Sequence, residues 1–240
     1  MAEKKEKKLT ASTTVTTPSG YTAKEAKPVG NAGGLRAGAV ILWVVAIVFE
    51  ILAVLVLFGK INITFMPQLW QLIAFIVLDL VCVIIGSQLW KKANHIKPAS
   101  KQNALKFWLW NNMGVIVSCF AFVPIIILML TNKDLDKKTK TIAVIAAVIA
   151  LIIGGAASID YNPVSQEELT AAEAALGETT VYWSPFGKVY HTHDDCSALN
   201  VSETLTYGTV DQAIAENRTR LCKFCAKRDN IENVTTDETK

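Results

Sequence analysis

The chain has 240 residues, of which 51% are hydrophobic, and a formal net charge of +3 at pH 7. Its apolar residues are gathered in uncharged blocks long enough to cross a bilayer, which excludes an ordinary soluble domain. The charge is asymmetric: residues 160–240 hold 14 acids and 7 Lys or Arg, and the remainder holds 7 acids and 17 Lys or Arg. A basic part that contains the apolar blocks indicates the cytoplasmic leaflet of a membrane, and nucleic acid is not expected as a partner.

Residues 1–36 are rich in Lys, Thr, Ala, Gly and Pro and contain almost no large apolar side chain. Such a segment cannot bury enough surface to offset the entropy of ordering, so we expect a disordered basic tail. The lysines between Lys4 and Lys8 are interpreted as a solvated group that fixes membrane orientation. The alternative is that they bind anionic lipid headgroups.

Four apolar segments predict transmembrane helices over residues 37–59, 70–90, 107–130 and 141–159. Each is close to the ~20 residues that an α-helix needs to cross ~30 Å of hydrocarbon. Small residues recur on one face of each segment, and such stripes let helix backbones approach closely. We therefore expect a compact four-helix bundle. The stripes are Ala39, Ala46 and Ala53; Cys82 and Gly86; Gly114, Ser118 and Ala121; and Ala143, Ala147, Ala150 and Gly154.

The distribution of Lys and Arg predicts the orientation of these helices. The tail and the loop after the second segment carry 7 and 5 basic residues, whereas both loops on the opposite side together carry 5. The positive-inside rule then places both termini in the cytoplasm of a multi-pass protein of the cell (inner) membrane. A reducing cytoplasm also keeps cysteines available as metal ligands.

Two acids fall inside the apolar segments, Glu50 in the first and Asp79 in the second. A carboxylate within a membrane is costly unless it is paired, protonated or wetted. One hypothesis is a proton- or cation-linked site formed by Glu50 and Asp79, joined by Asn111 or Asn112. The other is that two protonated acids share hydrogen bonds and serve only as structural contacts.

The region after the fourth segment reads as a spacer followed by a small module. Residues 160–178 predict a helical spacer, with a helix over Gln166–Leu176 that ends at Gly177. Residues 179–228 predict an α+β module that begins with a β-hairpin over Val181–His191. A capping box at Thr209 and Gln212 predicts a short helix within it. Residues 229–240 are expected to be a disordered tail.

Four metal-ligating residues stand out in this module. His191 and Cys196 form H-x4-C, and Cys222 and Cys225 form C-x2-C. Three thiolates and one imidazole in two close pairs are the ligands of a tetrahedral zinc ion. His193 is a competing ligand, because H-x2-C also has usable spacing. Three thiolates are typical of a closed structural site, and about fifty residues have too little core to fold securely without a metal.

Part of the module resembles a known kind of domain. The residues that carry the resemblance are Val181-Tyr182-Trp183, Gly187 to His191, Asp195 to Leu199, Gly208-Thr209 and Cys222-x-x-Cys225. They are similar to a small bacterial metal-binding module with a "GxxYH…DCxxL…G…CxxC" pattern, related in appearance to the Ada-type metal-binding fold. The resemblance covers about a fifth of the chain and implies the same four ligands. The transmembrane part resembles no family that we can name.

The predicted fold class is thus an α-helical membrane protein with a four-helix transmembrane bundle and a small α+β zinc-binding module at the carboxyl end. The first functional hypothesis is a bilayer-anchored scaffold that presents this module to a cytoplasmic or membrane protein partner. The second is a small transporter or channel that uses Glu50 and Asp79 and is regulated by the module. The third is a thiol or metal sensor that releases zinc on oxidation. No nucleophile–base pair or phosphate loop stands out, so enzymatic activity is not expected.

Overall fold

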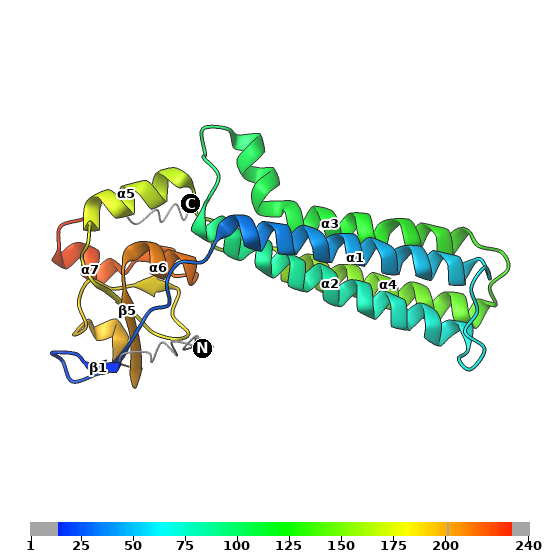
Figure 1. Ribbon diagram of the computed structural model, residues 1–240, viewed down its shortest axis with the longest axis horizontal. Coiled ribbons are helices and arrows are strands. Elements are labelled where there is room, and N and C mark those ends of the chain that lie inside the picture. Colours follow the sequence, from blue (N-terminus) through cyan, green and yellow to red (C-terminus); the bar gives the residue numbers. More distant parts are fainter. Residues whose placement is uncertain (1–13, 201, 232–240) are drawn as a thin grey trace, which may run out of the picture. The chain divides into compact units, whose positions relative to one another are not determined.

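A computed structural model of the chain describes residues 14–200 and 202–231. These residues form two compact units (Figure 1). The first unit is residues 30–167, which we call the helical unit. The second joins residues 14–29 to residues 168–231, and we call it the metal module.

Four long helices make up the helical unit: α1 (Ala32–Leu57), α2 (Gln68–Ile96), α3 (Ala104–Thr131) and α4 (Lys137–Ser158). Each is long and apolar enough to cross a membrane, as the sequence predicted. The helices run beside one another, and α2 contacts the other three (Figure 1). Three of them begin several residues before the predicted segments because polar residues cap their first turns. The side chains of Asn31, Asn103 and Asp136 accept hydrogen bonds from backbone N–H groups there.

The small residues predicted to line the helix faces do lie at the helix contacts. All are buried except Cys82, which is partly buried. At Gly114 a Cβ atom would lie 2.6 Å from the hydroxyl oxygen of Ser87, so only glycine fits without a shift. Large apolar side chains such as Phe122 and Met129 fill the remaining core. The bundle is therefore held together by close backbone approach at the small residues and by large apolar side chains that pack in the remaining core.

The metal module contains two small sheets. The first has the strand order β1 (Thr14–Thr16), β2 (Thr22–Glu25), β5 (Thr204–Gly208), β3 (Val181–Trp183). Strand β2 pairs with β5 in parallel, and the other two pairings are antiparallel. The second sheet pairs β4 (Val189–Tyr190) in parallel with β6 (Arg220–Leu221). The module also contains most of α5 (Gln166–Leu176), a 3-10 helix η1 (Ser197–Leu199), α6 (Val210–Ala215) and α7 (Lys223–Arg228).

Residues 14–25 differ from the expected disordered tail, because they form the hairpin β1–β2 on the sheet of the metal module. Strand β2 matches β5 from Thr22 opposite Thr204 to Glu25 opposite Tyr207. Ala23 is fully buried there. A composition argument misses this, because the apolar partners of the segment lie far along the chain. Residues 32–36 of the expected tail are the start of α1, and residues 1–13 and 232–240 lie outside the described residues.

The local elements predicted for the module are confirmed in part. The helix over Gln166–Leu176 forms and is followed by Gly177 at φ +55°. The capping box of Thr209 and Gln212 begins α6. The expected hairpin over Val181–His191 is reduced to one antiparallel bridge between Tyr182 and His191. Each of its strands has its longer ladder with another strand, β3 with β5 and β4 with β6.

Candidate metal centre

The parallel pairing of β4 with β6 brings the first two candidate ligands together. Tyr190 lies opposite Leu221 in this pair, so the next residue of each strand, His191 and Cys222, leaves the sheet at the same edge. The backbone N–H of Cys222 donates to the carbonyl oxygen of Tyr190 at 2.9 Å. Two further backbone hydrogen bonds of 2.7 Å tie His191 to Tyr182 of β3. Backbone pairing of the two strands therefore fixes the positions of both His191 and Cys222.

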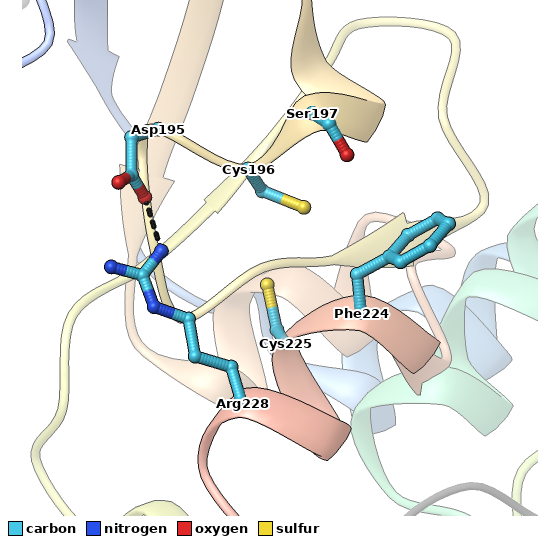
Figure 2. Close-up of a pocket in the computed structure, with 6 residues that line it drawn as sticks. All are labelled: Asp195, Cys196, Ser197, Phe224, Cys225 and Arg228. Carbon is cyan, nitrogen blue, oxygen red and sulfur yellow. Dashed lines mark hydrogen bonds and ion pairs between the residues drawn. The ribbon is translucent and has the colours of Figure 1, made fainter.

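Short helices place the other two ligands. Cys196 is the residue before η1, and Cys222 is the residue before α7. Cys225 lies in the first turn of α7, so Cys222 and Cys225 face the same point from one helix start. The loop that carries Cys196 is held against α7 by an ion pair between Asp195 and Arg228, with 2.7 Å between oxygen and nitrogen (Figure 2).

The structure brings all four predicted ligands into one buried cluster. Their ligating atoms lie within 4.8 Å of one another, and all four residues are buried. The sulfur atoms of Cys196 and Cys222 are 3.9 Å apart, and the sulfur of Cys225 is 3.7 Å from Nδ1 of His191. All five cysteines are free, so no disulfide competes for these thiols. The cluster can hold a metal ion.

Burial sets the protonation of these groups. It lowers the pKa of His191 to about 4, so the imidazole is neutral at pH 7 and has a lone pair to donate. Burial also raises the pKa of Cys196 to about 12, so this thiol stays protonated unless a cation stabilises the thiolate. A bound divalent cation supplies that charge, and metal binding here is expected to release protons.

His193, the competing ligand, lies outside the cluster. Its Nε2 atom is 2.6 Å from a carboxylate oxygen of Asp229, the residue that follows α7. The hydroxyl of Thr192 also donates to Asp229. These contacts fix the loop between His191 and Cys196 against the end of the helix that carries Cys225. The structure thus favours His191 as the ligand and gives His193 a supporting contact.

One side of the cluster is open. Cys196 and Cys225 line a pocket of about 140 Å³, together with Asp195, Ser197, Phe224 and Arg228. In Figure 2 the two sulfur atoms point toward each other, with the ion pair of Asp195 and Arg228 on one side and the Phe224 ring on the other. His191 and Cys222 do not line this pocket.

The predicted intramembrane site is only partly assembled. The rings of Phe49 in α1 and Phe75 in α2 are 6.4 Å apart. Glu50 follows Phe49, and Asp79 lies one helical turn after Phe75. Since Gly86 of α2 lies against Ala39 and Trp43 of α1, the two helices run in opposite directions, and the acids are offset by about 7.5 Å along them. Asp79 is buried, and its Oδ1 atom has no hydrogen-bond partner among the described residues.

Asn111 and Asn112 do not join these acids. The indole nitrogen of Trp90 and the amide of Asn94, both in α2, donate to the carbonyl oxygen of Trp110 in α3. This contact places the residue after Trp110 beside Trp90, which is 11 residues, or about 16 Å at 1.5 Å per residue, beyond Asp79. Asn112 instead donates to the carbonyl oxygen of Trp108 in its own helix. The structure therefore does not bring Asn111 or Asn112 to the two acids.

Sequence reasoning missed the contacts of the β1–β2 hairpin with the loop that carries Cys196. The backbone N–H of Ser19 donates to Asp194 at 3.0 Å, and the hydroxyl of Tyr21 donates to Asn200 at 3.2 Å. Burial alone would raise the pKa of Asp194, but the hydrogen bonds from Ser19 and Thr17 hold it below its usual value. The available signal was the run of β-branched residues before Pro18-Ser19-Gly20, a pattern typical of a strand and a turn.

Comparison with protein-family models, curated proteins and solved structures found no match to this chain. The resemblance of the module to the Ada-type fold therefore stays a prediction. The one histidine and three cysteines are candidate ligands only because their ligating atoms lie close together in a buried position.

Proposed function

We propose that this protein is a membrane-anchored binding protein. Its four long helices span a cell membrane with both termini in the cytoplasm, and its metal module, folded around one zinc ion, binds a protein partner. The observation that carries the proposal is the buried cluster of His191, Cys196, Cys222 and Cys225 in a chain that also has four membrane-length helices.

The outward faces of the helices support insertion in lipid. Large apolar side chains are exposed along them, for example Ile41 (64%), Phe120 (73%) and Ile152 (64%). In water such continuous apolar surface is rare on a monomer, whereas hydrocarbon removes its cost. The excess of Lys and Arg in the tail and in the loop after α2 supports cytoplasmic termini. Labelling of terminal cysteine tags in intact cells tests this, and reaction with an impermeant reagent would reject it.

The ligand separations support zinc. A tetrahedral zinc ion with Zn–S bonds of ~2.3 Å and Zn–N bonds of ~2.0 Å sets neighbouring sulfurs about 3.8 Å apart and sulfur and nitrogen about 3.5 Å apart. The sulfurs of Cys196 and Cys222 are 3.9 Å apart, the sulfur of Cys225 is 3.7 Å from Nδ1 of His191, and all four ligating atoms lie within 4.8 Å of one another. When bound, the ion would be held by His191, Cys196, Cys222 and Cys225 and would supply structural cross-linking between β4, η1 and α7.

Two aromatic side chains on the metal module support a protein partner. Phe186 is 98% exposed and Phe224 is 65% exposed. Exposed aromatic residues carry a large share of the binding energy at protein interfaces. In-membrane cross-linking should therefore compare the native chain with Phe186→Ser/Phe224→Ser and with Cys222→Ser/Cys225→Ser. We expect the same cross-linked partner to be lost in both variants, and its retention in both would reject the binding function.

A second candidate, proton- or cation-linked transport, rests on the unpartnered carboxylate oxygen of Asp79 inside the bundle. Intramembrane acids are functional candidates because an unpaired charge there is costly. Flux through proteoliposomes containing the native chain or Glu50→Gln/Asp79→Asn tests this. Flux that needs both acids supports transport, and flux equal to that of empty liposomes rejects it.

A further inference from the structure

The three cysteines of the metal cluster are not equally reachable. Cys196 and Cys225 line the open pocket of about 140 Å³, whereas Cys222 does not. Cys196 is 6% exposed, Cys222 is 5% exposed and Cys225 is 1% exposed, so the pocket lining, and not the exposed fraction, separates Cys225 from Cys222. The exposed ring of Phe224 stands at the pocket beside these two residues (Figure 2).

From this arrangement we infer that Cys196 and Cys225 are a reactive pair that small peroxides oxidise to a disulfide, while Cys222 is spared. The inference rests on the proposed zinc centre and specifies its regulation. The Cys196 thiolate attacks one oxygen of hydrogen peroxide, the O–O bond breaks, and a sulfenic acid and hydroxide form. The Cys225 thiolate then attacks the sulfenic sulfur and expels a second hydroxide. Two sulfurs lose one electron each, the peroxide takes up both, and two protons from solvent complete two water molecules.

The disulfide removes two of the four ligands at once. His191 and Cys222 remain, and two ligands do not make the four-coordinate site that structural zinc requires. Zinc therefore leaves in step with the loss of two thiols. A thiol reductant reverses the step and restores binding, because no sulfinic acid is formed.

We expect oxidation of the cluster to weaken the contacts of the β1–β2 hairpin as well. Asp194 and Asn200, which hold Ser19 and Tyr21 of the hairpin, lie in the loop that carries Cys196. That loop is fixed by the cluster and by the pair of Asp195 with Arg228. When the cluster is lost, we expect the hairpin to lose protection together with the loop.

The test uses the full chain in detergent with Cys82→Ala and Cys119→Ala, so that the three cluster cysteines are the only thiols. The zinc-loaded protein is treated with hydrogen peroxide, released zinc is followed with a chromophoric chelator, and thiols are mapped by alkylation and peptide mass spectrometry. We expect two thiols lost per zinc released, a Cys196–Cys225 disulfide, and Cys222 alkylated. A disulfide that contains Cys222, or oxidation with zinc retained, would overturn the inference.

Matched variants test the role of the pocket. Phe224→Ala should speed zinc release several-fold by widening access. Phe186→Ala, which removes a more exposed phenylalanine outside the pocket, should leave the rate unchanged. Equal rates in both would contradict entry through the pocket. Zinc content before peroxide separates the two proposals: a chain without zinc overturns the metal centre and this inference with it. A chain with one zinc and a different disulfide overturns only the inference.

Discussion

The two units of this protein are held together by different means. The helical unit consists of contiguous segments, each with an apolar stretch of membrane length, that approach closely at small residues. The metal module takes strands from residues 14–25 and from residues 181–221, and its four candidate ligands come from three separate positions along the chain. The hydropathy of single segments therefore suffices to predict the bundle. The metal module instead depends on pairing between strands far apart in the chain and on the proposed metal cross-link.

Removal of the candidate ligands is the strongest way to break this comparison. Cys222→Ser/Cys225→Ser should abolish zinc binding and unfold the metal module, because structural zinc contributes about 10–16 kcal/mol of apparent binding energy in small zinc-finger peptides. The four helices should keep their helical circular dichroism in detergent. Metal analysis and limited proteolysis measure the two effects, and Cys82→Ala/Cys119→Ala is the control. Full zinc content in the double serine variant would reject the site.

A substitution in the bundle should have the reverse effect, in which the helical unit is destabilised and the metal module is unchanged. Gly114→Leu forces a side chain against Ser87 and should destabilise the helical unit by about 1–3 kcal/mol. Gly155→Leu is the matched control, since a Cβ atom there meets nothing within 4 Å. Thermal unfolding in detergent measures the difference, and zinc content should be unchanged in both variants. Equal melting temperatures would show that helix contact at Gly114 is not tight.

A smaller change tests whether residues 14–29 belong to the metal module. At Gly208 a Cβ atom would lie 2.8 Å from the Cβ of Ala26 and would also contact Gln212. Gly208→Ala should therefore destabilise this contact by about 1–3 kcal/mol and speed amide hydrogen exchange in residues 22–26. Adding Ala26→Gly removes the first clash and should restore part of the protection. Unchanged exchange in Gly208→Ala would argue against the parallel pairing of β2 with β5.

The smallest expected effect concerns Asp194. Asp194→Ala removes the acceptor of the Ser19 N–H and should loosen the hairpin by about 0.5–1 kcal/mol, because the bond is exposed to solvent. Glu203→Ala, another acid of the module, is the control. Since the folded pKa of Asp194 is lowered, its contribution is present above pH ~4 and is lost as the pH falls further. Hydrogen exchange of residues 14–21 measures both dependences, and identical exchange in the two variants would contradict the contact.

The candidate metal ligands were predictable because their spacing is a local pattern, although two histidines satisfied it. The spacing of His191 and of His193 from Cys196 is acceptable for zinc, and only the fold separates them: the bridge to Tyr182 directs His191 into the cluster, while His193 meets Asp229. The intramembrane acids show the opposite case. Counting residues from the segment boundaries predicted a similar depth for Glu50 and Asp79, but it could not show that Asn111 lies beside Trp90.

The sequence by itself determined the four long helices, the small residues at their contacts and the four candidate ligands. Hydropathy, helix period and ligand spacing are properties of short stretches, so they can be read from the sequence without knowledge of the fold. Only the tertiary structure decided that residues 14–25 complete the sheet of a module almost two hundred residues away, and that one side of the cysteine cluster is open. Strand partners and the faces of a cluster depend on where distant segments meet, and no local pattern records that.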